Sequence, residues 1–204
     1  MKLIDAYIKI IQLNQPVLKT DDVAQCLDVT KVNASKIMER LRNSEYVLKI
    51  TRGLWAIKDK VTLWDLAGYI TNPMPYYISL QSALYYYGII SQIPEILYVI
   101  SPARTRLVNT PLGSISIHHI QTSFFCGYKK SKEGFYIATQ EKALIDFLYF
   151  SPARSYLFHN LPEVEIPENF SICRAEKFIK RIRSKRRQSA VHRLFQNILL
   201  RKNK

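Results

Sequence analysis

Positively charged and amide side chains recur at short intervals between residues 31 and 52. Ammonium and guanidinium groups bind phosphate oxygens, and guanidinium and carboxamide groups also bond to base edges in a DNA major groove. The side chains expected to enter the groove are Lys31, Asn33, Lys36 and Arg40. Those expected on backbone phosphates are Arg42, Lys49 and Arg52. The spacing therefore predicts a surface that contacts double-stranded DNA.

A helix that begins after Thr30 would position the first group. Its predicted buried side consists of Ala34, Ile37, Met38 and Leu41, which recur at helical spacing. Thr30 is placed to cap this helix, because its hydroxyl can accept an otherwise unpaired amide hydrogen. The β-rich residues 46–50 and 54–57 predict a hairpin whose tip, residues 51–53, carries Arg52.

Two further helices are expected before this one. The nearer helix starts at Asp21 with Thr20 as its cap, and its predicted buried residues are Val23, Ala24 and Leu27. The first helix carries an apolar stripe of Ile4, Ile8 and Ile11. Three helices and a hairpin predict a winged helix-turn-helix over residues 19–57, within a DNA-binding domain of residues 1–60. Two alternatives to DNA binding remain. The domain could be a protein-binding module of the same shape, or the charged side of the helix after Thr30 could be only a solvated surface.

The centre of the chain, residues 61–152, predicts a separate α+β domain. Helices are expected after Thr62, Ser79 and Thr139, each of which can act as a cap. The β-rich runs lie at residues 96–100, 106–109, 114–120, 124–129 and 135–137. An antiparallel sheet is their simplest arrangement. The fold class expected is thus α+β: a winged helix-turn-helix, a mixed domain with an antiparallel sheet, and C-terminal helices.

Five tyrosines lie in the short segment 76–87. Tyrosine rings can stack on nucleic-acid bases, but they also fill half-buried helix faces. Packing or a protein interface is the favoured interpretation, and base stacking is the alternative.

Positive charge concentrates at the two ends of the chain. The net charge is +4 over residues 1–58, −1 over residues 59–173 and +11 over residues 174–204. Residues 153–204 predict an acidic linker followed by two basic amphipathic helices that pack on or extend the second domain. Additional phosphate contacts are expected from Lys180, Arg181, Arg183, Lys185, Arg186 and Arg187. The alternatives are a helix pair on an anionic membrane and one that contacts nothing.

The sequence lacks the side-chain patterns of familiar enzymes. The Gly-Ser step at 113–114 has no downstream DxD of a nucleotidyltransferase, and no acid stands two residues before a lysine, as in PD-(D/E)xK nucleases. Glu141 and Asp146 are five residues apart, which suits a shared acid-base site on a helix poorly. His118 and His119 would point to opposite faces of a strand. We therefore expect binding rather than catalysis, with no metal and no cofactor.

Three widely spaced cysteines without a CxxC pair predict neither a disulfide framework nor a zinc site. No run approaches the roughly 20 apolar residues of a membrane span. We expect a soluble cytoplasmic protein with no membrane partner.

Parts of the central domain resemble the C-terminal domain of AbiEi-type antitoxins. The segments are ISLQSALYYYGIISQIPEILYVISP and YIATQEKALIDFLYF, with the HHI and FFCGY strands between them. The hairpin end Arg52-Gly53-Leu54-Trp55 also looks like that family's N-terminal domain. The resemblance is strongest at residues 138–146 and does not continue beyond Pro152.

The resemblance implies the antitoxin of a type IV toxin-antitoxin pair. In that family the winged helix-turn-helix binds inverted repeats at its own promoter, and the second domain supports repression and counteracts a nucleotidyltransferase-like toxin. Partners would then be promoter DNA, the toxin (directly or through its target) and, through the central domain, further copies of the chain in a homo-oligomer. Two other functions stay open: a stand-alone winged-helix transcription factor with a ligand- or partner-sensing second domain, and an RNA-binding or nuclease-like protein.

Overall fold

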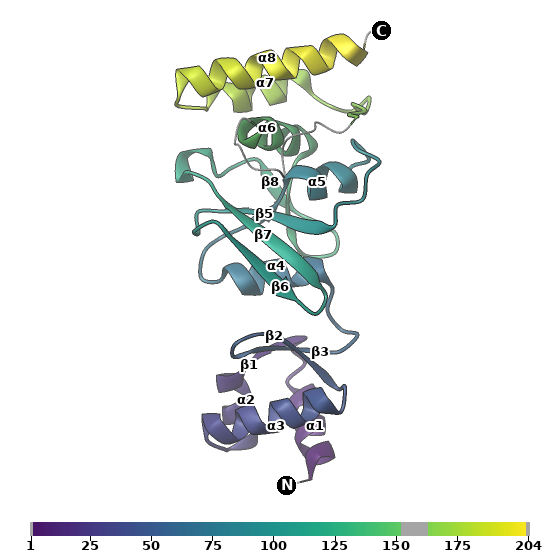
Figure 1. The fold of residues 1–204 in the computed structure, drawn as a ribbon, viewed down its shortest axis with the longest axis vertical. Helices are drawn as coiled ribbons and strands as arrows, with labels where there is room; N and C mark the ends of the chain where they lie inside the picture. The colour runs from purple at the N-terminus through teal and green to yellow at the C-terminus, as the bar shows by residue number, and fades with distance from the viewer. Residues whose placement is uncertain (1, 152–162, 203–204) are drawn as a thin grey trace. The chain divides into compact units, whose positions relative to one another are not determined.

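The computed structural model describes residues 2–151 and 163–202, in which helices combine with two sheets in a mixed α+β fold (Figure 1). Contacts divide the chain into two compact units. The first contains the residues up to Tyr69 together with Asn109–Gly113, and the second contains Ile70–Val108 and the residues from Ser114 onward. The sequence places the first boundary earlier, at residue 60.

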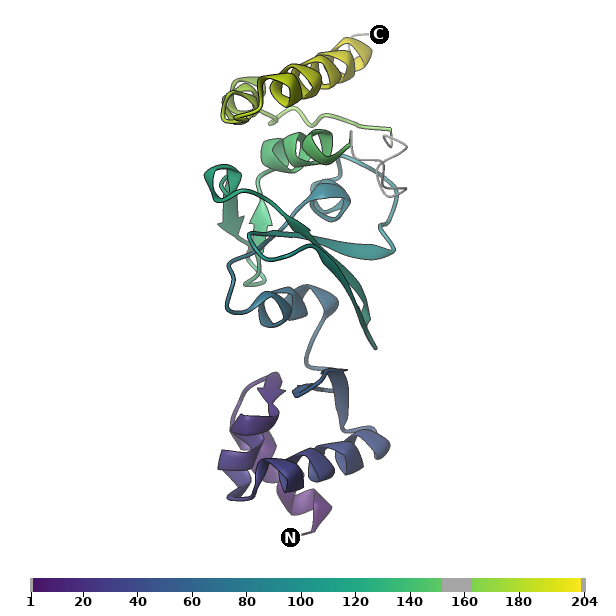
Figure 2. The ribbon, with the colours of Figure 1, turned by 60° about the vertical axis from the view of Figure 1, so that its left-hand side comes forward.

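The first unit packs three helices on a three-stranded antiparallel sheet (Figure 2). The elements are α1 (Leu3–Gln12), β1 (Val17–Lys19), α2 (Thr20–Leu27), α3 (Lys31–Asn43), β2 (Val47–Thr51) and β3 (Leu54–Ile57), and α4 (Leu63–Thr71) follows. The strand order is β1-β3-β2. The three helices and the two strands of the hairpin lie where the sequence predicts them, whereas β1 is too short to show a strand pattern in the sequence.

The core of this unit is shared by the helices and the sheet. Its buried residues are Ala6, Ile10, Leu18, Val23, Leu27, Ala34, Met38, Leu41, Val47, Trp55 and Ile57. The buried sides of α2 and α3 are those predicted from helical spacing. The prediction for α1 is wrong for two of its three residues, because Ile4 and Ile8 are 47% and 51% exposed while Ala6 and Ile10 are buried. The third, Ile11, packs against the core as a partly buried residue. α1 is apolar around most of its circumference, so spacing alone does not identify the side that meets the core.

The caps of α2 and α3 differ. Thr30 caps α3 as predicted, its hydroxyl accepting a backbone N–H of the first turn at 3.3 Å. Thr20 does not cap α2, because its hydroxyl accepts the indole N–H of Trp55 at 3.0 Å. Instead, the Asp22 carboxylate accepts the backbone N–H of Lys19 at 3.1 Å. Since Trp55 lies in β3, the bond to Thr20 ties the start of α2 to the hairpin.

The second unit contains a six-stranded sheet, apart from the residues at the β6–β7 turn that belong to the first unit. Its strands are β4 (Tyr77–Ile78), β5 (Ile96–Ser101), β6 (Arg106–Thr110), β7 (Gly113–His119), β8 (Tyr128–Lys130) and β9 (Tyr136–Ala138), in the order β6-β7-β5-β4-β9-β8. The prediction of an antiparallel sheet holds only in part, because the sheet is mixed. β4 pairs with β5, and β8 with β9, in antiparallel, whereas β5 pairs with β7, and β4 with β9, in parallel. β6 does not lie between β5 and β7 but at the edge of the sheet, next to β7. β7 therefore comes back beside β5 and runs parallel to it. The predicted strand at 124–129 is divided into the short helix η1 (Thr122–Phe124) and β8.

Helices α5 (Leu80–Tyr86), α6 (Gln140–Phe150), α7 (Ile172–Lys180) and α8 (Lys185–Lys202) complete this unit. α6 packs against α5, α7 and α8, and Figure 1 shows α7 and α8 on the side of α6 away from the sheet. The predicted apolar stripes of the C-terminal helices are confirmed, since Ala175, Ile179, Val191 and Phe195 are buried. The C-terminal helices therefore dock on the second unit. Residues 153–162 of the predicted linker lie outside the described residues.

A buried polar cluster joins α6 to the segment around β4. Lys142 and Asp146, one helical turn apart, form an ion pair with no exposed side-chain surface. Asp146 also accepts hydrogen bonds from the hydroxyls of Tyr77 at 3.1 Å and Ser79 at 2.9 Å. Burial raises the pKa of Asp146 despite its three partners, and it also raises the pKa of Tyr77. The prediction that Ser79 caps α5 is wrong, because its hydroxyl is engaged by Asp146.

His118 should make the stability of the second unit depend on pH. Its ring packs against Tyr98 and Phe150 and bonds to the Ser116 hydroxyl at 2.9 Å, and burial lowers its pKa from 6.5 to about 4. Between these values the unfolded chain binds a proton that the folded chain does not, so stability is lost as the pH falls. We expect the free energy of unfolding to drop by about 2 kcal/mol from pH 7 to pH 5.

Urea unfolding at the two pH values measures this effect. His118→Gln should remove most of the difference, whereas His119→Gln, on the exposed neighbour, should keep it. An unchanged pH dependence in His118→Gln would show that other groups are responsible.

Candidate nucleic-acid interface

A groove of about 790 Å³ lies between α3 and the β2–β3 hairpin. Its charged lining residues are Lys31, Lys36, Arg40, Lys49, Arg52 and Glu39. The other lining residues are Thr20, Val32, Ser35, Gly53 and Trp55. Gly53 forms the hairpin tip with a φ of +76°, a left-handed conformation that favours glycine, and so places Arg52 at the turn. Five cations against one acid make this concave surface strongly positive.

Five of the seven residues predicted to contact DNA line this groove, and two do not. Asn33 and Arg42 are both exposed on α3 but lie outside the lining. Successive helical residues turn by about 100°, which puts Asn33 about 40° from Ile37, a partly buried residue that packs against the core. Asn33 therefore stands on the flank of α3, and the central positions belong to other residues.

Sequence reasoning missed three groove-lining residues of α3, namely Val32, Ser35 and Glu39. Val32 and the fully buried Leu41 are nine residues apart, which places them about 180° apart around the helix axis. The signal was present in the sequence: the exposed centre of a helix lies opposite the middle of its apolar side. A selection of cationic and amide side chains does not include these three residues.

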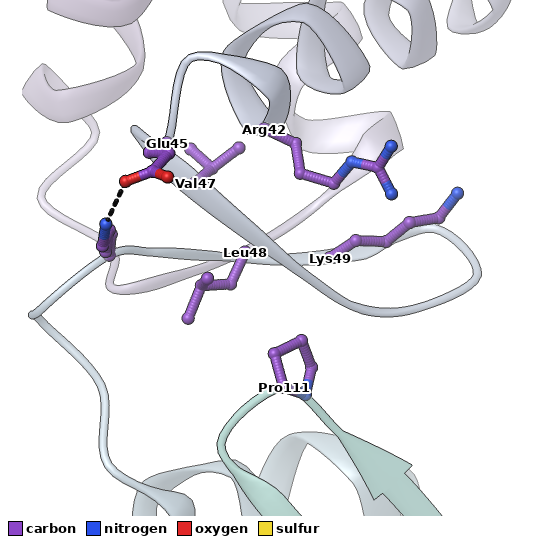
Figure 3. Close-up of a pocket in the computed structure, with 7 residues that line it drawn as sticks. Arg42, Glu45, Val47, Leu48, Lys49 and Pro111 are labelled. Carbon is purple, nitrogen blue, oxygen red and sulfur yellow. Dashed lines mark hydrogen bonds and ion pairs between the residues drawn. The ribbon is translucent and has the colours of Figure 1, made fainter.

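Ion pairs hold some of these cations, whereas others have no side-chain partner among the residues that the structure describes. Lys31 pairs with Asp21 at 2.8 Å, and Glu39 pairs with Lys49 at 2.5 Å and with Arg42 at 3.0 Å. The hydrogen bond from Lys49, assisted by the charge of Arg42, lowers the pKa of Glu39. Figure 3 shows the charged ends of Arg42 and Lys49 on the same side of the hairpin.

Three groove cations are available for an anionic ligand. Within the described residues, the side chains of Lys36, Arg40 and Arg52 make no hydrogen bond or ion pair. Because no internal bond has to be broken, these cations can contact phosphate at little cost to the fold.

Glu39→Gln is expected to strengthen the binding of duplex DNA about three- to tenfold at low salt, whatever the sequence. The change removes the groove's acidic charge and releases Lys49 and Arg42 for phosphate. Fluorescence anisotropy with several unrelated duplexes measures it. Glu45→Gln is the matched control, because Glu45 lies outside the groove and pairs with Lys58 at 2.8 Å (Figure 3). Equal effects of the two changes would rule out a special role for Glu39.

The basic C-terminal helices present a second group of cations. Exposed members of the predicted set are Lys180, Arg181, Arg183, Lys185 and Arg186. Arg187 differs, because its Nη1 donates to the Tyr149 carbonyl at 3.1 Å and its guanidinium lies over the Tyr149 ring at 4.7 Å. Arg187 is thus engaged within the second unit, and the other five cations face solvent.

Arg183→Gln together with Arg186→Gln should reduce the steepness of the log-log dependence of DNA affinity on salt by about 2 units. Each lost phosphate contact removes about 0.9 of a unit. Salt titrations of binding measure the slope. Arg187→Gln is the control, since it should lower the stability of the second unit and leave the slope nearly unchanged. A slope that stays the same in the double variant would mean that these helices do not meet the DNA.

Packing accounts for most of the tyrosines in segment 76–87. Tyr77 is buried and bonded to Asp146, and the Tyr87 hydroxyl donates to the Ala138 carbonyl at 2.8 Å. The Tyr86 hydroxyl donates to Glu133 at 3.2 Å. These contacts agree with the favoured interpretation of structural tyrosines.

Glu141 and Asp146, the acidic residues considered for chemistry, have different partners. Asp146 bonds to Lys142, whereas Glu141 accepts the backbone N–H of Ser171 at 3.3 Å. Within residues 2–151 and 163–202, no three His, Cys, Asp or Glu side chains gather where they could hold a metal ion. In the same ranges, none of the helices combines the length and the apolar character needed to cross a membrane.

No protein-family model matches this chain, and no curated protein matches it either.

Proposed function

We propose that the chain binds double-stranded DNA through an N-terminal winged helix-turn-helix. In this assignment α2, the turn at Asp28 and α3 are the helix-turn-helix, and the β2–β3 hairpin is the wing. Asp28 has a φ of 52°, a left-handed conformation that ends α2 and allows α3 to start soon afterwards. The three helices and the sheet order β1-β3-β2 support the assignment.

The positive charge of the groove is the observation that carries the proposal. Duplex DNA presents one negative charge per roughly 1.7 Å of its axis, and an α-helix fits its major groove. Lys36 and Arg40 on α3, with Arg52 on the hairpin, offer cations from two elements to one ligand. With α3 in the major groove, its cations would meet bases and phosphates while Arg52 meets the adjacent backbone.

We further propose that the chain regulates its own promoter and acts as the antitoxin of a type IV toxin-antitoxin pair. This role depends on the resemblance of the central segments to AbiEi-type antitoxins. The two longer segments contain α5, β5, β9, α6 and the last residue of β4, so the second unit would be the part that counteracts a nucleotidyltransferase-like toxin. A stand-alone regulator would share the DNA-binding activity but lack this effect.

Two assays test the two parts of this proposal. A mobility-shift assay should find a complex with a fragment of the chain's own promoter at low ionic strength, and weaker binding to a scrambled fragment. Co-expression with the product of an adjacent nucleotidyltransferase-like gene should restore growth that the product alone arrests. Absence of any DNA complex would overturn the first part, and growth arrest that persists at equal expression would overturn the second.

A further inference from the structure

Val32 occupies an unusual position for an apolar side chain. It is 64% exposed and lines the positive groove, on the side of α3 opposite the buried Leu41. Its groove-lining neighbours on α3 are the polar residues Lys31, Ser35 and Lys36. Val32 therefore presents two methyl groups at the part of the helix that points most directly away from the core.

Folding gives little reason for valine at this position. β-Branched side chains are restricted in helices, so an exposed valine is less favourable there than alanine, lysine or arginine. Single exposed apolar residues are common on protein surfaces. Val32, however, lies in the first turn of α3, the helix proposed to enter a major groove, and not at an arbitrary surface position.

The first turn of a recognition helix is the part that meets base edges. Among the groups exposed in the major groove, the thymine C5-methyl is the apolar one, and small apolar side chains recognise it by direct contact. A cationic surface would favour any DNA sequence equally, because phosphates carry no sequence information. An apolar side chain among the cations would instead discriminate between bases.

We propose that Val32 is a specificity-determining residue that contacts the methyl group of a thymine in the bound DNA. The inference depends on the proposed DNA-binding function and goes beyond it by naming a base within the preferred site. Lys36 lies one turn further along the same side of α3 and binds the neighbouring phosphate or base edge. This contact sets the depth to which Val32 enters the major groove of the DNA.

The test uses the full chain and DNA selected for binding from a random duplex library. Each thymine of the selected site is replaced in turn by uracil, which keeps the base-pairing edge and removes only the methyl group. For the wild-type chain, at least one replacement should weaken binding about three- to fivefold, the effect of losing one buried methyl contact. For Val32→Ala, the same replacement should have a much smaller effect, because the two γ-methyl groups that would contact the thymine methyl are absent and only the Cβ methyl remains.

Two controls make the result specific to Val32. Ile4→Ala removes a similarly exposed apolar side chain from α1, outside the groove, and should leave the uracil effect unchanged. Val32→Ile retains apolar contact and should keep most of the effect. Circular dichroism checks that each variant is folded.

The possible failures can be distinguished. Sequence-selective binding with no uracil effect in the wild type, or with equal effects in the wild type and Val32→Ala, would overturn the role of Val32 and leave the DNA-binding function standing. If the library yields no selected DNA at low ionic strength, the proposed function fails, and the role of Val32 fails with it.

Discussion

Replacing Lys36, Arg40 and Arg52 together by alanine is expected to lower the affinity for duplex DNA at least about a hundredfold at low salt. All three cations line the groove, and within the described residues none has a side-chain partner inside the protein. The loss of three phosphate or base contacts should also make the log-log salt dependence less steep by about 2.5 to 3 units. Anisotropy titrations over a range of salt concentrations measure both quantities.

A matched variant separates the groove from total charge. Lys2, Lys9 and Lys60 are exposed cations of the first unit that do not line the groove, so their joint replacement by alanine changes the net charge equally. This control should weaken binding only severalfold. Equal losses in the two triple variants would mean that DNA responds to overall charge and not to the groove.

Lys142→Met should lower the free energy of unfolding of the second unit by about 3 to 5 kcal/mol. Among the described residues, the change leaves the buried Asp146 carboxylate with the hydroxyls of Tyr77 and Ser79 as its partners. A buried charge without a counter-ion has lost its water and gained no equivalent attraction. Chemical denaturation followed by far-ultraviolet circular dichroism measures the loss.

Two comparisons sharpen this prediction. Trp55 and Trp64 both lie in the first unit, so the transition in tryptophan fluorescence should move much less than the change in circular dichroism. Combining Lys142→Met with Asp146→Leu removes both charges and should cost less than the sum of the single changes. Additive losses would show that Lys142 and Asp146 contribute independently and not as a pair.

Helical spacing correctly predicts which side of a helix is buried when the helix has only one apolar side. The buried side of α3 is the predicted one, because charged residues mark its solvent side clearly. Thr30 caps α3, as its position before the helix predicts. α1 does not follow its predicted stripe, since apolar residues such as Ile4 and Ile8 also face solvent. A helix with two apolar sides needs knowledge of its neighbours before its orientation can be assigned.

The sheet of the second unit could be predicted only in part. Most strands were visible as β-rich runs, but their pairing was not. β4, with two residues, is too short to be detected, yet it is the strand that lies between β5 and β9. Whether two strands pair in parallel depends on the order of the strands in the sheet. No local pattern in a single sequence encodes that order.

The polarity of single residues does not identify two features of the structure, the buried Lys142–Asp146 pair and the position of Val32. Lys142 and Asp146 are four residues apart, a spacing that favours an ion pair on a helix, and Lys142 rather than Glu141 is the partner of Asp146. In the groove beside α3, charge identifies the cations, whereas the position of Val32 follows from its angle around the helix axis. In both cases the angular position around the helix was more informative than residue type.

Lysine modification in the presence of DNA tests the central claim most directly. The full chain is acetylated at low extent, with and without a duplex selected from a random library, and the extent at each lysine is measured by mass spectrometry. DNA should reduce modification of Lys36 and Lys49 in the groove severalfold and leave Lys9 and Lys60 unchanged. Equal modification of these lysines in the presence and absence of bound DNA, or the absence of a complex at low ionic strength, would contradict the claim that this groove binds DNA.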